Sequence, residues 1–138
     1  MKSRKKTGKP KSTRSRPRMP SWFPLDDEMK QLSAMLEGEV SGWPGVSKKN
    51  MFGYQGLYRN GQIFAALPRS RAMKSPRSLM LKFANASPII LNSLEKDPRV
   101  DTVSGMTGAR WFFFELDEAS AVKDALGWLG RAYDAAKQ

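Results

Sequence analysis

Residues 56–67 read Gly56-Leu57-Tyr58-Arg59-Asn60-Gly61-Gln62-Ile63-Phe64-Ala65-Ala66-Leu67, so that an Asn-Gly pair separates two runs rich in aromatic and aliphatic side chains. Both central residues of a type I′ turn have positive φ, a conformation that Asn and Gly adopt at the least cost. The pattern therefore predicts an antiparallel hairpin with strands over residues 56–59 and 62–67. It is the strongest local signal in the chain.

Downstream of the hairpin, the sequence predicts further strands and a short helix. Leu79, Leu81 and Phe83 alternate with other residues, which is typical of a strand with one face inward. Ser87-Pro88 has the form of an N-cap followed by a proline at the first helical position, and Asp97-Pro98 should end that helix. A brief strand is predicted over residues 100–103, a turn over 104–109, and a strand inside the sheet over 110–116, where both sides are apolar.

The last helix is predicted from Glu118 to about Ala136, with Asp117 as its cap. Gly127 and Gly130 would each cost about 1 kcal/mol relative to Ala inside a helix, which indicates a close approach of the backbone to the sheet. The apolar positions share one face of this helix: Ala121, Val122, Ala125, Leu126, Leu129 and Tyr133.

Upstream of the hairpin, a first helix is predicted, with Pro24 in its first turn and a buried face of Met29, Leu32 and Leu36. The acidic run at residues 26–28 suits the positive end of the helix dipole. The element order predicts an α+β fold, a two-layer sandwich of helices on one antiparallel sheet.

The positive charge of the chain is concentrated at its start. The 138 residues contain 24 Lys and Arg against 13 Asp and Glu, a formal charge of +11. Without the cations of the first 21 residues, which contain no acid, the charge falls to +2. We therefore predict a disordered basic arm over residues 1–21 and one α+β domain over 22–138. The nine cations of the arm are Lys2, Arg4, Lys5, Lys6, Lys9, Lys11, Arg14, Arg16 and Arg18.

The composition excludes most catalytic chemistry. The chain has no Cys and no His, so disulfides, thiolate catalysis, imidazole acid/base catalysis and the common zinc sites are excluded. It also lacks the glycine-rich phosphate loops. Three carboxylates at residues 26–28 could hold a hard cation, but the helix dipole explains them more simply. We predict no enzyme, no cofactor and no metal site. No transmembrane segment or cleaved export signal is predicted, and the expected location is cytoplasmic.

Nucleic acid is the partner that this charge pattern favours. Closely spaced cations displace counterions from a phosphate backbone and give salt-dependent binding that does not depend on sequence. Residues 68–78 are predicted to be a long exposed loop with four more cations and no acid, which could contact phosphates alongside the arm: Arg69, Arg71, Lys74 and Arg77. The alternatives are a solubilising tail and a solvated loop.

Other residues near the hairpin also have two interpretations. Lys48, Lys49 and Arg59 could extend a phosphate-binding surface, or they could protect a sheet edge. Unpaired bases could stack on an aromatic side chain, although core packing is the commoner fate of such residues in strands. The aromatic candidates are Trp43, Tyr54, Tyr58 and Trp111.

Residues 49–67 resemble the opening hairpin of TfoX N-terminal domains, with their Met-Phe-Gly start, Gly-Leu-Tyr strand, Asx-Gly turn and Phe-Ala strand. Residues 79–83, Leu-Met-Leu-Lys-Phe, are similar to that family's Leu-Tyr-Leu-Lys strand. Trp111 with the following helix through Tyr133 resembles the end of YjbR-like proteins. The resemblance covers roughly residues 25–137. It implies a YjbR-like, frataxin-related sandwich and DNA binding without a shared catalytic site. The basic arm and the 68–78 segment depart from the family pattern.

The predicted function is therefore non-enzymatic nucleic-acid binding, with DNA favoured over RNA. The alternative is a protein-interaction module or a self-associating domain, such as a homodimer, in which the basic tail is incidental. No membrane partner is expected, because the arm lacks apolar residues that would insert beside its charges.

Overall fold

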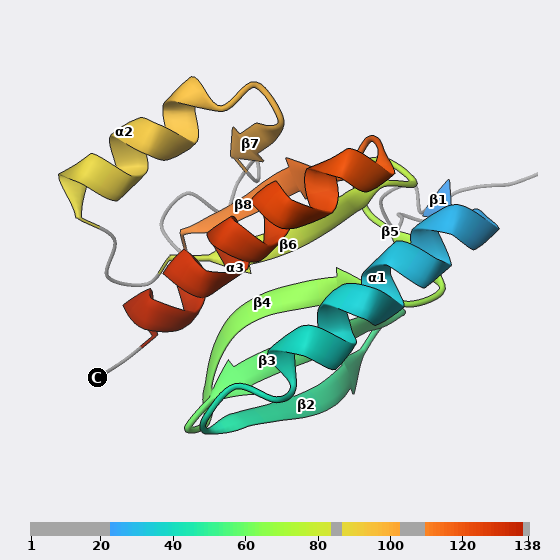
Figure 1. Cartoon of the computed structure of the whole chain (residues 1–138), viewed down its shortest axis with the longest axis horizontal. Coiled ribbons are helices and arrows are strands. Elements are labelled where there is room, and N and C mark those ends of the chain that lie inside the picture. Colours follow the sequence, from blue (N-terminus) through green and yellow to red (C-terminus); the bar gives the residue numbers. More distant parts are fainter. Residues whose placement is uncertain (1–22, 84–86, 103–109, 137–138) are drawn as a thin grey trace, which may run out of the picture.

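A computed structural model describes residues 23–83, 87–102 and 110–136, which form both helices and strands (Figure 1). The predicted arm and Trp22 lie outside these residues, as does the whole of the predicted turn at 104–109. The elements are β1 (Phe23–Pro24), α1 (Asp27–Val40), β2 (Val46–Met51), β3 (Tyr54–Arg59), β4 (Gln62–Pro68), β5 (Arg71–Ala72), β6 (Ser78–Lys82), α2 (Pro88–Lys96), β7 (Val100–Thr102), β8 (Trp111–Glu115), the 3-10 helix η3 (Ala119–Ala121) and α3 (Val122–Ala135).

Six of the strands form one antiparallel sheet in the order β2-β3-β4-β6-β8-β7, and β1 pairs with β5 in a small separate sheet. Helices α1 and α3 lie side by side over one face of the large sheet, while α2 lies apart, beside β7 (Figure 1). The chain is an α+β protein with a large antiparallel sheet, as predicted.

The predicted hairpin is confirmed as β3 and β4. Asn60 and Gly61 have φ angles of 49° and 87°, the positive values that the turn requires. The register shifts after Leu57, so that this side chain faces Ala65 whereas Tyr58 faces Ile63. This irregularity leaves Phe64 in an unpaired position, where it is fully buried against the Tyr133 ring of α3.

The core lies between the sheet and the two long helices. α1 buries the predicted Met29, Leu32 and Leu36, and α3 buries residues of its predicted face, among them Ala125 and Leu129. Each fully buried Leu, Phe or Met stabilises the fold by about 1.5–3 kcal/mol relative to an exposed one. The sheet contributes Leu57, Phe64, Leu67, Leu79, Leu81 and Phe114 to this core, all fully buried.

The central and C-terminal strands are also confirmed. β8 lies between β6 and β7, as expected for a strand that is apolar on both sides. α2 has the predicted N-cap, because Ser87 Oγ accepts a hydrogen bond of 3.3 Å from Ile90 N, and it ends before Asp97.

The start of α1 differs from the prediction. Pro24 belongs to β1, opposite Arg71 of β5, and the helix begins at Asp27. The cap is Asp26, whose Oδ1 accepts a hydrogen bond of 2.7 Å from Met29 N. A proline has no N–H to donate, so it fits a short edge strand as readily as a first helical turn.

Two predictions about the last helix are wrong. Asp117 is not its cap, because the chain first forms η3, with Glu118 in the N-cap position, and α3 begins only at Val122. Gly127 does not mark a close approach, because a Cβ placed there meets nothing within 4 Å. At Gly130 the nearest atom is Trp43 Cη2 at 3.9 Å, an ordinary contact.

Candidate nucleic-acid interface

The segment that carries the nine arm cations joins the described part of the chain at β1. In β1, Phe23 is opposite Ala72 and Pro24 is opposite Arg71. The pairing places the start of the described chain beside β5, the strand that contains one of the four cations predicted in residues 68–78. Lys2 to Arg18 themselves lie outside the described residues.

Three chain segments meet at this end of the sheet. Gly53 O, in the turn between β2 and β3, accepts hydrogen bonds from Arg69 N at 2.8 Å and Ser70 N at 3.2 Å. Ser70 O in turn accepts one of 3.2 Å from Leu25 N, just after β1. We define the turn cluster as residues 23–24, 52–53 and 69–71.

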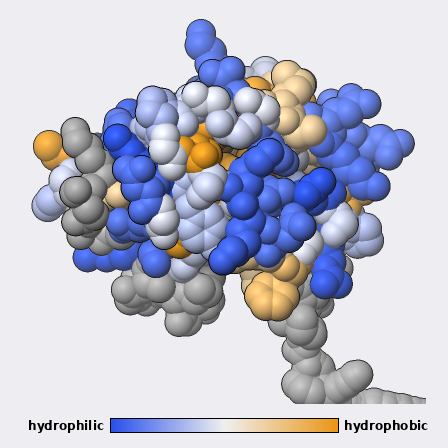
Figure 2. Space-filling model, turned by 90° about the horizontal axis from the view of Figure 1, so that it is seen from below, coloured by the Kyte–Doolittle hydropathy of each residue, from blue (hydrophilic) through white to orange (hydrophobic). Residues whose placement is uncertain are grey.

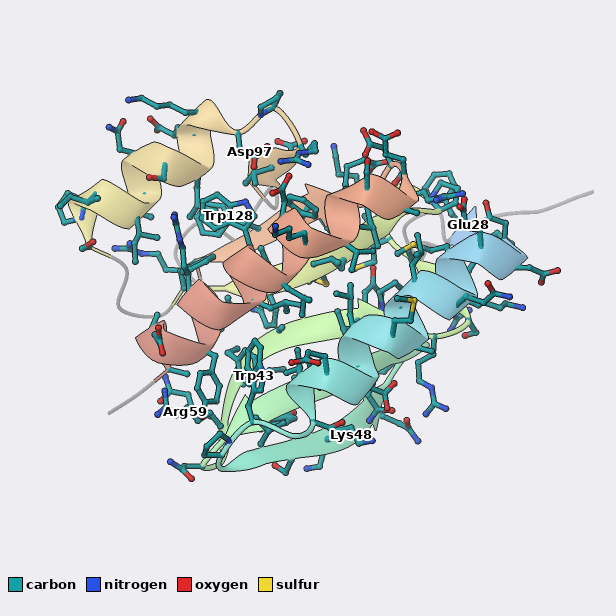
Figure 3. All side chains as sticks on the ribbon, viewed as in Figure 1. Glu28, Trp43, Lys48, Arg59, Asp97 and Trp128 are labelled. Carbon is teal, nitrogen blue, oxygen red and sulfur yellow. The ribbon has the colours of Figure 1, made fainter. Side chains whose placement is uncertain are left out.

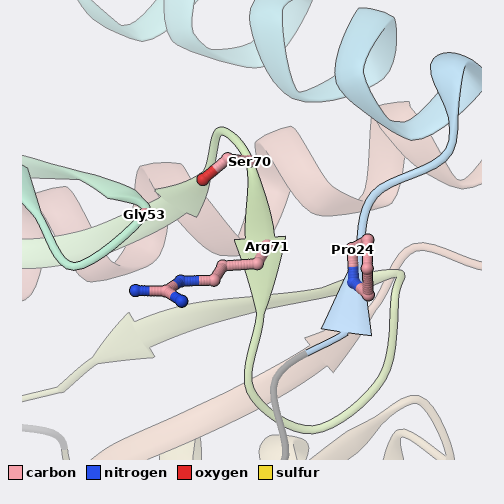
Figure 4. A pocket seen from close by; sticks show the side chains of 4 residues that line it. All are labelled: Pro24, Gly53, Ser70 and Arg71. Atoms are coloured by element: carbon pink, nitrogen blue, oxygen red, sulfur yellow. The ribbon is translucent and has the colours of Figure 1, made fainter.

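A shallow hollow of about 370 Å³ opens in the turn cluster and is lined by Pro24, Gly53, Ser70 and Arg71 (Figure 4). The Arg71 side chain extends from β5 toward the Gly53 turn (Figure 4). A Cβ at Gly53 would stand 2.8 Å from Arg71 Cγ, so glycine is required there for steric reasons as well as for its φ of 89°.

Arg69 is exposed, and its guanidinium contacts neutral side chains. Its Nη1 donates to Gln55 Oε1 at 2.8 Å and to Asn50 Oδ1 at 3.1 Å, and both acceptors are neutral amides. Within residues 23–83, 87–102 and 110–136 it forms no ion pair. The two amides orient the guanidinium without cancelling its charge, which suits a phosphate contact.

Lys74 and Arg77, the other two cations of the predicted loop, face carboxylates. Lys74 pairs with Asp101, and Arg77 Nη2 pairs with Asp26 at 3.1 Å and with Glu28 at 2.7 Å. The pKa of Arg77 is raised, chiefly by its hydrogen bond with Glu28. The pKa of Asp26 is lowered, chiefly by the backbone hydrogen bond from Met29 and further by Arg77. These two cations therefore form internal ion pairs, whereas Arg69 contacts neutral amides.

The interpretation of residues 68–78 as an exposed loop also needs correction. Pro68, Ala72 and Ser78 are buried, and the segment includes β5. Tyr54 Oη accepts a hydrogen bond of 2.9 Å from Met73 N, and burial raises the pKa of this Tyr. Only the Arg69–Arg71 turn projects with all of its residues exposed. The sequence signal, a run of cations and prolines, does not reveal these long-range contacts.

The aromatic candidates from the sequence belong mainly to the core. Tyr54 and Trp111 are buried, while Trp43 and Tyr58 are partly buried. Trp43 packs edge-on against the Tyr133 ring, with centroids 5.1 Å apart. These four side chains are therefore less accessible to a base than an exposed ring would be.

Phe52 is the exposed aromatic residue that the sequence analysis misses. Its side chain is 78% exposed, and its φ of 47° lies in the left-handed region, at a cost of roughly 1–2 kcal/mol for a residue with a Cβ. A signal is present in the sequence, because Phe52-Gly53 separates two strands in the same way as Asn60-Gly61 does.

The cations of the first hairpins have mixed roles. Lys48 and Lys49 are both exposed on β2, and Lys48 donates to Glu37 of α1 at 3.0 Å. Arg59 donates to Tyr133 O at 3.0 Å and lies 4.0 Å from the centroid of that ring, so it holds the end of α3 (Figure 3). Hydrophilic side chains dominate the face on the β2 and α1 side, where the apolar patches are small and separate (Figure 2).

A second polar cluster joins the end of α2 to α3 (Figure 3). Asp97 accepts hydrogen bonds from Arg99 and from Trp128 Nε1, the latter at 3.0 Å, and Arg99 also pairs with Asp124. Burial would raise the pKa of Asp97, but the hydrogen bonds outweigh it and lower the pKa. The donors and acceptors of this cluster satisfy one another, which indicates a structural role.

The described residues offer neither a metal cluster nor a membrane span. No group of three or more carboxylate residues within them could hold a metal ion, and Asp26 and Glu28 instead contact Arg77. No helix in the part of the chain that the structure describes is long and apolar enough to cross a bilayer.

Comparison of the chain with protein-family models, with curated proteins and with solved structures finds no significant match. The resemblance to TfoX N-terminal and YjbR-like domains therefore stays a prediction.

Proposed function

We propose that the chain is a non-enzymatic nucleic-acid-binding protein that contacts phosphates with its basic arm and with the turn cluster. The observation that carries this proposal is the distribution of charge. Residues 1–21 contain nine cations and no acid, and they lead directly into β1, next to the turn that exposes Arg69 and Arg71. A cationic segment that ends at further exposed cations can follow one phosphate backbone.

The contacts made by residues 68–78 reduce the number of cations that we assign to the phosphate-binding surface. Lys74 and Arg77 are paired with acids, so they contribute less to an anion site than the sequence indicates. Arg69 and Arg71 stay in the proposal because they occupy the exposed turn. We infer no base-reading residue from these cations, because contacts with phosphate position a protein without reading sequence.

For the finer fold we infer a YjbR-like, frataxin-related sandwich. Its support is the element order: a helix, three successive antiparallel strands, a fourth strand, a short helix, two more strands and a terminal helix. The protein-interaction alternative has weaker support. The exposed large apolar residues among those described are Met35, Phe52 and Ile89, which lie on α1, in the β2–β3 turn and on α2. Single exposed apolar residues are ordinary and do not define a docking surface.

The test is a titration of labelled duplex DNA and of RNA at several salt concentrations. It compares the full chain with a full-length variant in which the nine Lys and Arg of residues 1–21 are replaced by Gln. We expect the logarithm of the wild-type binding constant to fall linearly with the logarithm of salt concentration, by about 0.9 for each phosphate contacted on duplex DNA. The slope should be several units smaller for the variant. Absence of binding at low salt would refute the proposed function.

A further inference from the structure

The residue that folding explains least is Phe52. The second central position of its turn is a glycine with φ 89°, as this turn type requires, but the first is a bulky aromatic with φ 47°. The neighbouring hairpin places Asn60 at the equivalent position, with φ 49°, and Asn is a residue that such turns favour. Phe52 is therefore not favoured by its backbone conformation. It also does not contribute to the core, since its side chain is 78% exposed.

Other aromatic residues in the described segments show what a structural role looks like here. Phe64 and Phe83 are fully buried and pack edge-on against the rings of Tyr133 and Trp128. Phe52, in contrast, stacks on no other ring within the described residues. Backbone strain together with an unused ring face is typical of a binding position.

The surroundings of Phe52 supply what a nucleotide needs besides a ring. The adjacent Gly53 accepts backbone hydrogen bonds from Arg69 and Ser70, which fixes the Arg69–Arg71 turn next to the Phe52-Gly53 turn. Arg69 is oriented by neutral amides, and the Arg71 side chain passes 2.8 Å from where a Gly53 Cβ would be. The hollow beside them, about 370 Å³, falls within the usual range for small-ligand sites.

We propose that the turn cluster binds unpaired nucleic acid, with one base stacked on the Phe52 ring and the adjoining phosphates at Arg69 and Arg71. This inference rests on the proposed function and names its substrate class. A base inside a duplex is covered by its neighbours on both faces and cannot stack on a protruding side chain, whereas a base in a single strand can. Any base has a flat face, so the contact confers a preference for single strands without a preference for sequence.

Phe52→Asn tests the stacking contact without loss of the fold. Asn tolerates the left-handed conformation better than Phe, so the variant should fold at least as stably as the wild type, which a thermal melt checks. Ile89→Asn is the matched control, because Ile89 is also 78% exposed, lies on α2 and receives the same replacement. Both full-length variants and the wild type are titrated with a labelled oligothymidylate and with a duplex of equal length.

We expect Phe52→Asn to weaken binding of the single strand about five- to hundredfold, and to leave duplex binding within about twofold of the wild type. Ile89→Asn should change neither. If the wild type binds neither ligand, the proposed function is refuted, and this inference with it. If the wild type binds but Phe52→Asn weakens neither ligand, or weakens both equally, the inference is wrong and the proposed function stands.

Discussion

Arg77 donates a hydrogen bond of 3.1 Å to the carboxylate of Asp26, the residue that caps α1. Asp26 thereby has two functions, because its other oxygen accepts the hydrogen bond from Met29 N. Arg77 immediately precedes β6, so the pair connects the start of the first helix to the fourth strand of the large sheet. Arg77 was predicted to contact phosphate, but in the structure it connects α1 to β6.

This contact predicts a pH dependence of stability. The pKa of Asp26 is lowered from its ordinary value of 3.8, so its contribution is present above pH 3.8 and is lost as the pH falls through the folded-state pKa. We expect Asp26→Asn, which keeps a capping oxygen, to lose less stability than the wild type in that acidic range. Urea unfolding midpoints over a pH series measure this. Asp27→Asn, which removes a neighbouring charge, is the control. Equal acid loss in Asp26→Asn and wild type would contradict the prediction.

Replacement of Gly127 is predicted to stabilise the fold. This residue lies in the middle of α3 with open space where a Cβ would be, so Gly127→Ala should raise the free energy of unfolding by about 1 kcal/mol. Denaturant unfolding measures the change. Gly53→Ala serves as the contrast and should destabilise the fold, because its φ is 89° and its Cβ would meet Arg71. A destabilised Gly127→Ala would show that the helix needs a glycine there after all.

Ser33 offers a test of the contact between α1 and the sheet. Its buried Oγ donates a hydrogen bond of 2.6 Å to Pro68 O at the end of β4. Ser33→Ala leaves that carbonyl without its partner and should lower the free energy of unfolding by about 1–3 kcal/mol. Ser47→Ala, at an exposed position of β2, should change it by less than about 0.5 kcal/mol. Equal effects of the two substitutions in urea unfolding would contradict this account.

The salt dependence of DNA binding can distinguish the cation that contacts neutral amides, Arg69, from a cation that is paired with an acid, Lys74. Arg69→Gln should reduce the slope of the logarithmic plot of duplex affinity against salt by about 0.9, the value of one phosphate contact. Lys74→Gln should reduce it less, because Asp101 already compensates that charge. Fluorescence anisotropy over a salt series provides the slopes. A larger effect of Lys74→Gln would move the interface away from the turn cluster.

Features that depend on interactions between residues close in sequence could be predicted, whereas features that depend on distant residues could not. The β3–β4 turn was predictable because Asn60 and Gly61 fix their own φ angles. Helix α2 was predictable because the Ser87 cap bonds to Ile90 N, only three residues away. Pro24 was misassigned because its strand depends on pairing with Arg71, far along the chain. Asp117 was misassigned because the chain forms η3 before α3.

The candidate site was less predictable than the fold. The Arg and Lys residues of 68–78 look equivalent in the sequence, yet their roles differ according to which acid or amide the folded chain brings to each. The Arg77 side chain meets Asp26 and Glu28, whereas the Arg69 guanidinium meets the neutral amides of Asn50 and Gln55. The exposure of Phe52 likewise depends on the pairing of β2 with β3.

The composition of β2 has a consequence for behaviour in concentrated solution. β2 is an edge strand of the six-stranded sheet, and its residues 47–50, Ser-Lys-Lys-Asn, are all exposed. An identical strand docking along this edge would bring like-charged lysines together, which opposes intermolecular strand addition. The protein should therefore resist growth into fibrils through β2 while that edge remains open to solvent.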